Sequence, residues 1–216
     1  MIEWTSLVEC ADRLADAVST ALAHTLALGR RASLVVSGGS TPVPFFHALR
    51  DRILPWARVS VLLADERQVP TGHRDSNERL VREHLLTPGH AASAATWVPL
   101  TDDAVRPLLP FTVVVLGMGN DGHTASLFPE APELDALLDP AGIALVAPVT
   151  PATAPHARLT LTVAALVQSR ARFLHITGPD KRRTLEASIA SLAAGEGALP
   201  IARVHATAPL QFYWSP

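Results

Sequence analysis

The 216-residue chain has few of the features that mark cross-linked or membrane-bound proteins. Its one cysteine, Cys10, excludes an internal disulfide and any metal cluster held by several thiolates. No apolar run reaches membrane-spanning length, and residues 1–30 lack the cationic start of a signal peptide. We therefore expect a cytoplasmic protein that does not bind membranes.

The chain also lacks an excess of charge of either sign. The formal net charge is −2, which argues against a nucleic-acid partner because a phosphate backbone needs a basic face. Among 18 Lys and Arg residues, Lys181 is the only lysine. This bias fits a genome-wide preference for arginine. The count alone leaves open whether Lys181 is present by chance or has a function as a cation.

Helical and strand patterns alternate along the chain, which is typical of a parallel sheet covered by helices. Strands are expected over residues 33–36, 59–63, 111–116, 143–149, 172–177 and 210–214, and helices over 7–28, 42–50 and 180–194. A further helix runs through Leu86; Asp75 and Ser76 are interpreted as its caps, with Glu78 available for a capping box. No Ser/Gly/Pro-rich linker divides the chain, so residues 1–216 are expected to form one α/β domain.

Polar clusters follow four of the predicted strands. They are Ser37–Thr41, Asp65–Arg67, Asp121–His123 and Gly178–Lys181. Parallel strands share one carboxyl edge, which is where open α/β sheets bind their ligands. The four clusters are therefore expected to converge although they lie far apart in sequence.

The stretch Leu116–Pro129 reads L-G-M-G-N-D-G-H-T-A-S-L-F-P and follows a strongly apolar strand. Its glycines match G-x-G-x-x-G, but Asp121 stands where a nucleotide pyrophosphate would lie and would repel it. A plain glycine-rich turn with an incidental histidine is the other alternative. We favour a site in which His123 acts as general base while Asp121 sets its tautomer or orients a reactant.

The Ser37–Thr41 loop (Ser37, Gly38, Gly39, Ser40, Thr41) lies between a strand and a helix, where backbone N–H groups can bind one phosphate. An ordinary tight turn is the alternative. Asp65 and Arg67 are candidates for substrate hydroxyls and phosphate, with loop structure as an equal alternative. Arg158 either contacts a substrate phosphate or is an ordinary surface charge. Lys181 lies near the start of a predicted helix, where the helix dipole disfavours a cation, and this suggests a nearby anion.

Other chemistries have less support. Asp121 and His123 offer two metal ligands, but no third His, Asp or Glu has the spacing to complete a recognisable site. No G-x-S-x-G motif is present, which argues against an acyl-enzyme on serine. We therefore expect no metal and no cofactor.

Taken together, S-G-G-S-T-P, A-D-E-R-x-V-P with D-S-N after it, G-M-G-x-D-G-H-T-A-S-L-F-P, R-L-T-L-T and G-P-D-K resemble the 6-phosphogluconolactonase family. The resemblance runs in order from Ser37 to Lys181. It implies a three-layer αβα sandwich with a mostly parallel, Rossmann-like sheet, as in glucosamine-6-phosphate deaminase and ribose-5-phosphate isomerase. It also implies hydrolysis of 6-phosphoglucono-δ-lactone in the oxidative pentose phosphate pathway.

By the same resemblance His123 matches the general base and Asp121 the acidic residue that supports it. Substrate and phosphate contacts fall on the Ser37–Thr41 loop and on Asp65, Arg67, Asn77, Arg158 and Lys181. The family usually has an asparagine soon after R-x-T-L-T, whereas Val167 stands here. Any role of that asparagine is therefore in doubt for this chain.

Two alternatives accompany the lactonase. A glucosamine-6-phosphate deaminase would carry Asn-Glu-Pro after the Asp-Gly-His, where this chain has Leu127-Phe128-Pro129. A non-catalytic sugar-phosphate sensor would carry a DNA-binding extension, which the sequence lacks. The expected partner is a small sugar-phosphate lactone. A monomer is expected, with a weak homodimer as the alternative.

Overall fold

The computed structural model describes residues 2–3, 6–152 and 154–216, and its centre is a seven-stranded sheet in which every neighbouring pair is parallel. The strand order is β1-β10-β9-β6-β2-β3-β5. The bounds are β1 Ile2–Glu3, β10 Gln211–Ser215, β9 Ser169–Thr177, β6 Phe111–Leu116, β2 Ala32–Val36, β3 Val59–Leu63 and β5 Thr96–Trp97. Such a sheet needs helical cover on both faces.

The central strands β2, β3 and β6 are buried at every position, which explains their continuous apolar sequences. Successive side chains point to opposite faces. Leu34 and Val36 therefore join one hydrophobic core, whereas Val35 joins the other.

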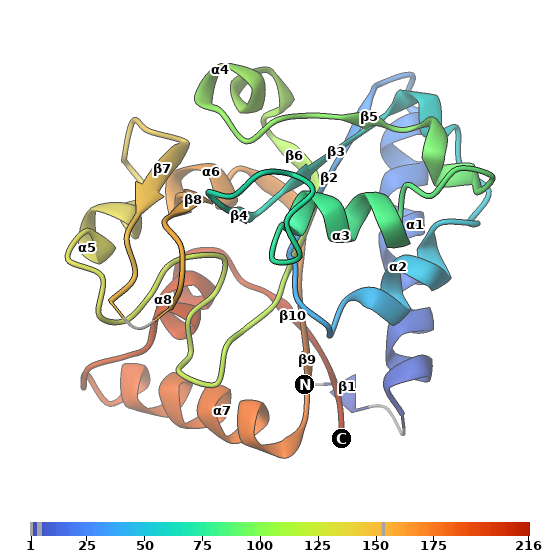
Figure 1. The fold of residues 1–216 in the computed structure, drawn as a ribbon. Helices are drawn as coiled ribbons and strands as arrows, with labels where there is room; N and C mark the ends of the chain where they lie inside the picture. Colours follow the sequence, from blue (N-terminus) through green and yellow to red (C-terminus); the bar gives the residue numbers. More distant parts are fainter. Residues whose placement is uncertain (1, 4–5, 153) are drawn as a thin grey trace.

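Helices cover the two faces in two groups, which lie on either side of the strands in Figure 1. One group is α1 Leu7–Ala27, α2 Val43–Leu49 and α3 Asn77–His84; the other is α5 Leu134–Leu137, α6 Val163–Leu166, α7 Pro179–Ala193 and α8 Pro200–Thr207. The α1 helix ends as predicted, because Gly29 adopts a φ of 74° just beyond it. The predicted α/β sandwich is confirmed.

A second, antiparallel sheet of three strands was not predicted. It consists of β4 Asp65–Arg67, β8 Arg158–Leu161 and β7 Val146–Val149, in that order. The prediction that residues 143–149 belong to the main sheet is wrong. Pro148 lacks an N–H group and is exposed, so this segment suits the edge of a small sheet.

The start of α3 differs from the predicted capping box. Ser76 is the N-cap, as expected, and its Oγ accepts a hydrogen bond from Arg79 N. Asp75 is not a cap, and Glu78 pairs with Arg82 instead. The carboxylate of Glu66 accepts from the N–H groups of Asn77 and Glu78 and from the Ser76 hydroxyl. Glu66 therefore links β4, in which it lies, to the start of α3.

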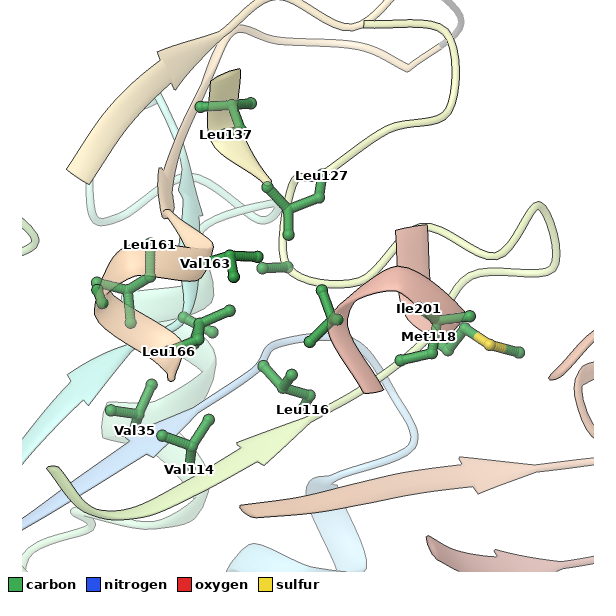
Figure 2. Close-up of a cluster of buried hydrophobic side chains, with 14 of the residues drawn as sticks. Val35, Val114, Leu116, Met118, Leu127, Leu137, Leu161, Val163, Leu166 and Ile201 are labelled. Atoms are coloured by element: carbon green, nitrogen blue, oxygen red, sulfur yellow. The ribbon is translucent and has the colours of Figure 1, made fainter. Parts of the chain in front are cut away.

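The long loop after β6 is anchored by its own apolar residues. Figure 2 shows Leu127 directed into a cluster formed by strand, loop and helix residues, and its side chain is 0% exposed. The other labelled members are Val35, Val114, Leu116, Met118, Leu137, Leu161, Val163, Leu166 and Ile201. This packing gives residues 117–128 a fixed position at the carboxyl edge of the sheet.

Among the described residues, no helix is both long enough and apolar enough to cross a membrane.

Candidate active site

A cavity of about 250 Å³ opens at the carboxyl ends of β2, β6 and β9. The predicted residues that line it are Ser37, Gly38, Gly39, Ser40, Thr41, Asp65, Arg67, Asn77, His123 and Lys181. All four polar clusters therefore contribute to one cavity, as predicted from the shared edge of parallel strands. Asp121 and Arg158 are the two predicted site residues that do not line it.

Asp121 lies behind His123 and fixes its ring. Asp121 Oδ1 is 2.6 Å from His123 Nδ1 and also accepts a hydrogen bond from His123 N at 3.2 Å. A carboxylate beside Nδ1 selects the tautomer that carries its proton there. His123 Nε2 is then the nitrogen that can accept a proton from a molecule in the cavity.

The turn that carries this pair is closely packed. The Phe128 ring lies 4.6 Å from the His123 ring, centroid to centroid. Gly122 has a φ of 80°, and its carbonyl accepts a hydrogen bond from Ile201 N at the start of α8. A Cβ on Gly119 would overlap the His123 ring and the Asp121 carboxylate. Glycine at position 119 therefore leaves the space in which the two side chains meet.

The Ser37–Thr41 loop presents unoccupied backbone donors. In the described part of the chain, the N–H groups of residues 38–41 have no protein acceptor. Gly39 adopts a φ of 93°, which lets the backbone turn within the loop. The Ser37 hydroxyl, in contrast, accepts a hydrogen bond from Gly117 N and ties β2 to β6. An anion in the cavity would satisfy the donors of this loop.

Arg67 and Arg158 lie opposite each other on β4 and β8. Arg67 Nη1 donates to the carbonyl of Asp75 at 2.6 Å. The Nε of each arginine is buried, without a hydrogen-bond partner in the described chain. Burial lowers the pKa of Arg158, and the charge of Arg67 lowers it further. The carboxylates of Asp65, Glu66 and Asp75 act in the opposite direction, so they partly balance the two guanidinium groups. Arg67 lines the cavity and Arg158 lies beside it.

Asp65 and Asn77 also line the cavity. Asp65 accepts a hydrogen bond from the Ser126 hydroxyl at 2.6 Å, and its carbonyl accepts one from Asn77 Nδ2. Gly38 packs against Asn77 so closely that a Cβ there would overlap the amide. This network links the loops after β2, β3 and β6 to one another.

Lys181 lies in the first turn of α7, which follows β9, and it lines the cavity. Burial lowers the pKa of its ammonium group. The structure shows no ion pair between Lys181 and any described residue. Lys181 is half-buried, so leaving its charge without a partner has a cost that an anionic ligand would reduce.

His175, on β9, is a cavity residue that the sequence analysis missed. It is 2% exposed, and neither ring nitrogen has a hydrogen-bond partner among the described residues. Burial, with the nearby charge of Lys181, lowers its pKa to about 4. The only sequence signal is a histidine within the apolar run Phe173–Ile176. Val167, at the position where the family usually has asparagine, lies at the end of α6 and outside the cavity.

A model of the family described as glucosamine-6-phosphate isomerases/6-phosphogluconolactonase matches residues 5–214. The 6-phosphogluconolactonase of Pseudomonas aeruginosa is 44% identical over 226 residues, which cover 99% of this chain and 93% of that protein. A 6-phosphogluconolactonase of Neisseria meningitidis serogroup A is 44% identical over 200 residues, which cover 85% of each.

Solved structures agree with these matches. The crystal structure of a 6-phosphogluconolactonase from Shewanella baltica aligns with a TM-score of 0.85 at 38% identity, covering 99% of this chain and 96% of that one. A monomeric glucosamine-6-phosphate deaminase aligns with a TM-score of 0.75 at 15% identity, covering 99% and 96%. This second likeness concerns the fold alone.

The Gly119→Ala substitution is expected to lower turnover at this site by about tenfold or more. The added Cβ would displace the His123 ring, so the base would no longer be aligned with the reactant. Gly117→Ala is the matched control, since the nearest atom to its added Cβ is Ser37 Cβ at an ordinary 3.9 Å. Steady-state kinetics on both variants measure the difference. Equal activity in the two would show that the crowding at Gly119 is not important.

Stability is expected to fall as the pH is lowered from about 6.5 to about 4, because His175 stays neutral in the folded state while the unfolded chain takes up the proton. The difference between the ordinary histidine pKa of 6.5 and the His175 pKa of about 4 corresponds to about 3 kcal/mol of unfolding free energy, at 1.36 kcal/mol per pKa unit. Urea unfolding at several pH values measures this slope. A His175→Leu variant should lose the part of the pH dependence that comes from His175. An unchanged slope of unfolding free energy against pH would contradict the attribution to His175.

Proposed function

The chain belongs to the glucosamine-6-phosphate isomerase/6-phosphogluconolactonase family, and from this premise we propose that it hydrolyses 6-phospho-D-glucono-1,5-lactone to 6-phospho-D-gluconate. The observation that carries the proposal is the shared cavity. His123 lines it together with residues 38–41, Arg67 and Lys181. A substrate that carries both a phosphate and an ester has groups for the donors and for the base.

The phosphate end is bound by groups that have few protein partners. The N–H groups of residues 38–41 supply directional donors, and Arg67 and Lys181 supply charge. Arg158 acts from behind Arg67 by raising the positive potential. Asp65 and Asn77 line the same cavity, which supports a role for them in contacting the sugar hydroxyls. Binding at the phosphate positions the lactone carbonyl near His123.

The chemical step needs a base and then an acid. His123 Nε2 takes a proton from a water molecule while the water oxygen bonds to the lactone carbonyl carbon. The tetrahedral intermediate collapses by breaking the bond from that carbon to the ring oxygen. The imidazolium returns its proton to the departing ring oxygen, which leaves the open-chain acid. Asp121 holds Nδ1–H throughout and stabilises the transient positive charge.

This reaction corresponds to the lactone-opening step of the oxidative pentose phosphate pathway. The product carries a new carboxylate, so two negative groups share a cavity that held one. We expect their repulsion to favour release of the product. The direct test is hydrolysis of freshly prepared lactone, corrected for spontaneous opening and run beside a deaminase assay with glucosamine 6-phosphate.

The structure disfavours the deaminase alternative at one point. The residues after the Asp-Gly-His segment include Leu127 and Phe128. Leu127 is fully buried in the core, and Phe128 packs on the His123 ring. Neither side chain can donate or accept a proton. Ring opening of an amino sugar would therefore lack a carboxylate at this position.

We further propose that the chain works as a cytoplasmic monomer. The Cys10 thiol is buried, and burial raises its pKa to about 12, with a smaller contribution from Glu9. An unpaired thiol of this kind suits a reducing compartment. Both hydrophobic cores pack on strands of one sheet, so the chain can fold as one unit. Sedimentation velocity tests the monomer, and a dimer at micromolar concentration would contradict it.

The His123→Ala substitution is expected to lower kcat by about 10²–10⁴-fold, which is the usual contribution of a positioned base. KM should change little because the phosphate contacts remain. Steady-state assays at several substrate concentrations separate the two constants. Near-normal turnover would remove His123 from the catalytic role.

The Lys181→Met substitution is expected mainly to raise KM, by about tenfold, since it removes a charge-assisted contact to the phosphate. Arg182→Met is the matched control, because the Arg182 guanidinium lies over the Trp214 ring and the residue does not line the cavity. The same assay compares both variants. An equal change in KM would mean that Lys181 acts only through the general charge of α7.

A further inference from the structure

A second group of ligand-bearing side chains lies outside the cavity. His73 and Asp75 come from the loop before α3, and His156 comes from the segment before β8. In the described part of the chain this is the one group of three His, Cys, Asp or Glu residues whose ligand atoms all lie within 4.8 Å of one another. The mechanism above uses none of them.

The donor atoms have a spacing that a metal ion requires. Asp75 Oδ2 is 3.1 Å from His156 Nε2 and 3.8 Å from His73 Nδ1. In a tetrahedral zinc site with bonds of about 2.0–2.1 Å, neighbouring donors lie about 3.3 Å apart. The Asp75 pairs lie close to this value, and the two histidine donors lie within 4.8 Å of each other, so the side chains have to close on the ion to bring three donors to one centre.

The site is accessible to an ion. The side chains are 39%, 37% and 29% exposed for His73, Asp75 and His156, so an ion can enter from solvent. His73 Nδ1 accepts a hydrogen bond from Asp75 N, which a metal would replace.

The backbone holds the two segments together. Gln68 N donates to Ala157 O at 2.8 Å beside the β4–β8 pairing, which fixes the segment that carries His156. His156 itself adopts a φ of 69°, an uncommon conformation for a residue with a side chain. The rings of His73 and His156 meet edge to face at 5.4 Å. The ligands are thus presented before any ion arrives.

We propose that His73, Asp75 and His156 bind one divalent transition-metal ion of the zinc class, with a fourth position open to water. Two imidazoles and one carboxylate are ligands that Zn²⁺ and Co²⁺ accept, whereas Mg²⁺ and Ca²⁺ prefer oxygen. The ion would lie next to the substrate cavity, because the carbonyl of Asp75 holds Arg67. The proposal does not depend on the lactonase reaction.

The test is calorimetric titration of the full chain with Zn²⁺, alongside titration with Co²⁺ followed by visible absorption. One ion is expected to bind per chain. His156→Ala should weaken binding by at least about tenfold, since it removes a direct ligand. His73→Ala should do the same, and it serves as a second variant if the first fails to fold. Mg²⁺ should not compete.

Two control variants locate the ion. His47 and His84 also approach each other, at 3.1 Å between ring nitrogens, but no described residue offers them a third ligand. His84→Ala and His123→Ala should therefore leave zinc affinity unchanged. Absence of zinc binding in the unaltered chain would overturn the proposal, as would loss of binding in His84→Ala or His123→Ala with binding retained in His156→Ala.

Discussion

The common direction of the strands in the main sheet is the constraint on which the rest of the molecule depends. Because β2, β6 and β9 all run the same way, the segments that follow them leave from one edge. The Ser37–Thr41 loop, the Asp121–His123 turn and Lys181 are brought together by this direction. Apolar residues such as Leu127 then hold the loops in place, so the geometry of the cavity depends on the core.

The cavity contains several polar groups whose partners the protein does not provide. The N–H groups of residues 38–41, Arg67 Nε and both nitrogens of His175 are examples from the described chain. Leaving them unpaired costs stability. That cost is reduced when a ligand with complementary charge and hydroxyl groups enters. Affinity for a phosphorylated sugar therefore arises in part from the instability of the empty site.

Much of the fold could be predicted from sequence, and the reasons differ between elements. β3 and β6 were predicted to the residue because they are apolar apart from one residue each, Ser60 and Thr112, and are rich in valine and leucine. β4 consists of three charged residues and shows no period, whereas β8 alternates polar and apolar residues but is only four residues long. The cavity residues followed from strand ends, but His175 lies inside a strand and was missed. His156 is 81 positions from Asp75, so sequence spacing could not reveal their contact.

The single carboxylate of Glu66 has a mechanical consequence. It accepts hydrogen bonds from Arg67 N, Ser76 Oγ, Asn77 N and Glu78 N, so β4 and the start of α3 move as one body. That wall of the cavity is stiff. Residues 38–41 on the cavity have no comparable fastening, since their backbone donors are bound to no described part of the protein. One cavity therefore combines a wall fixed by a carboxylate with a loop whose N–H groups are left for something outside the protein.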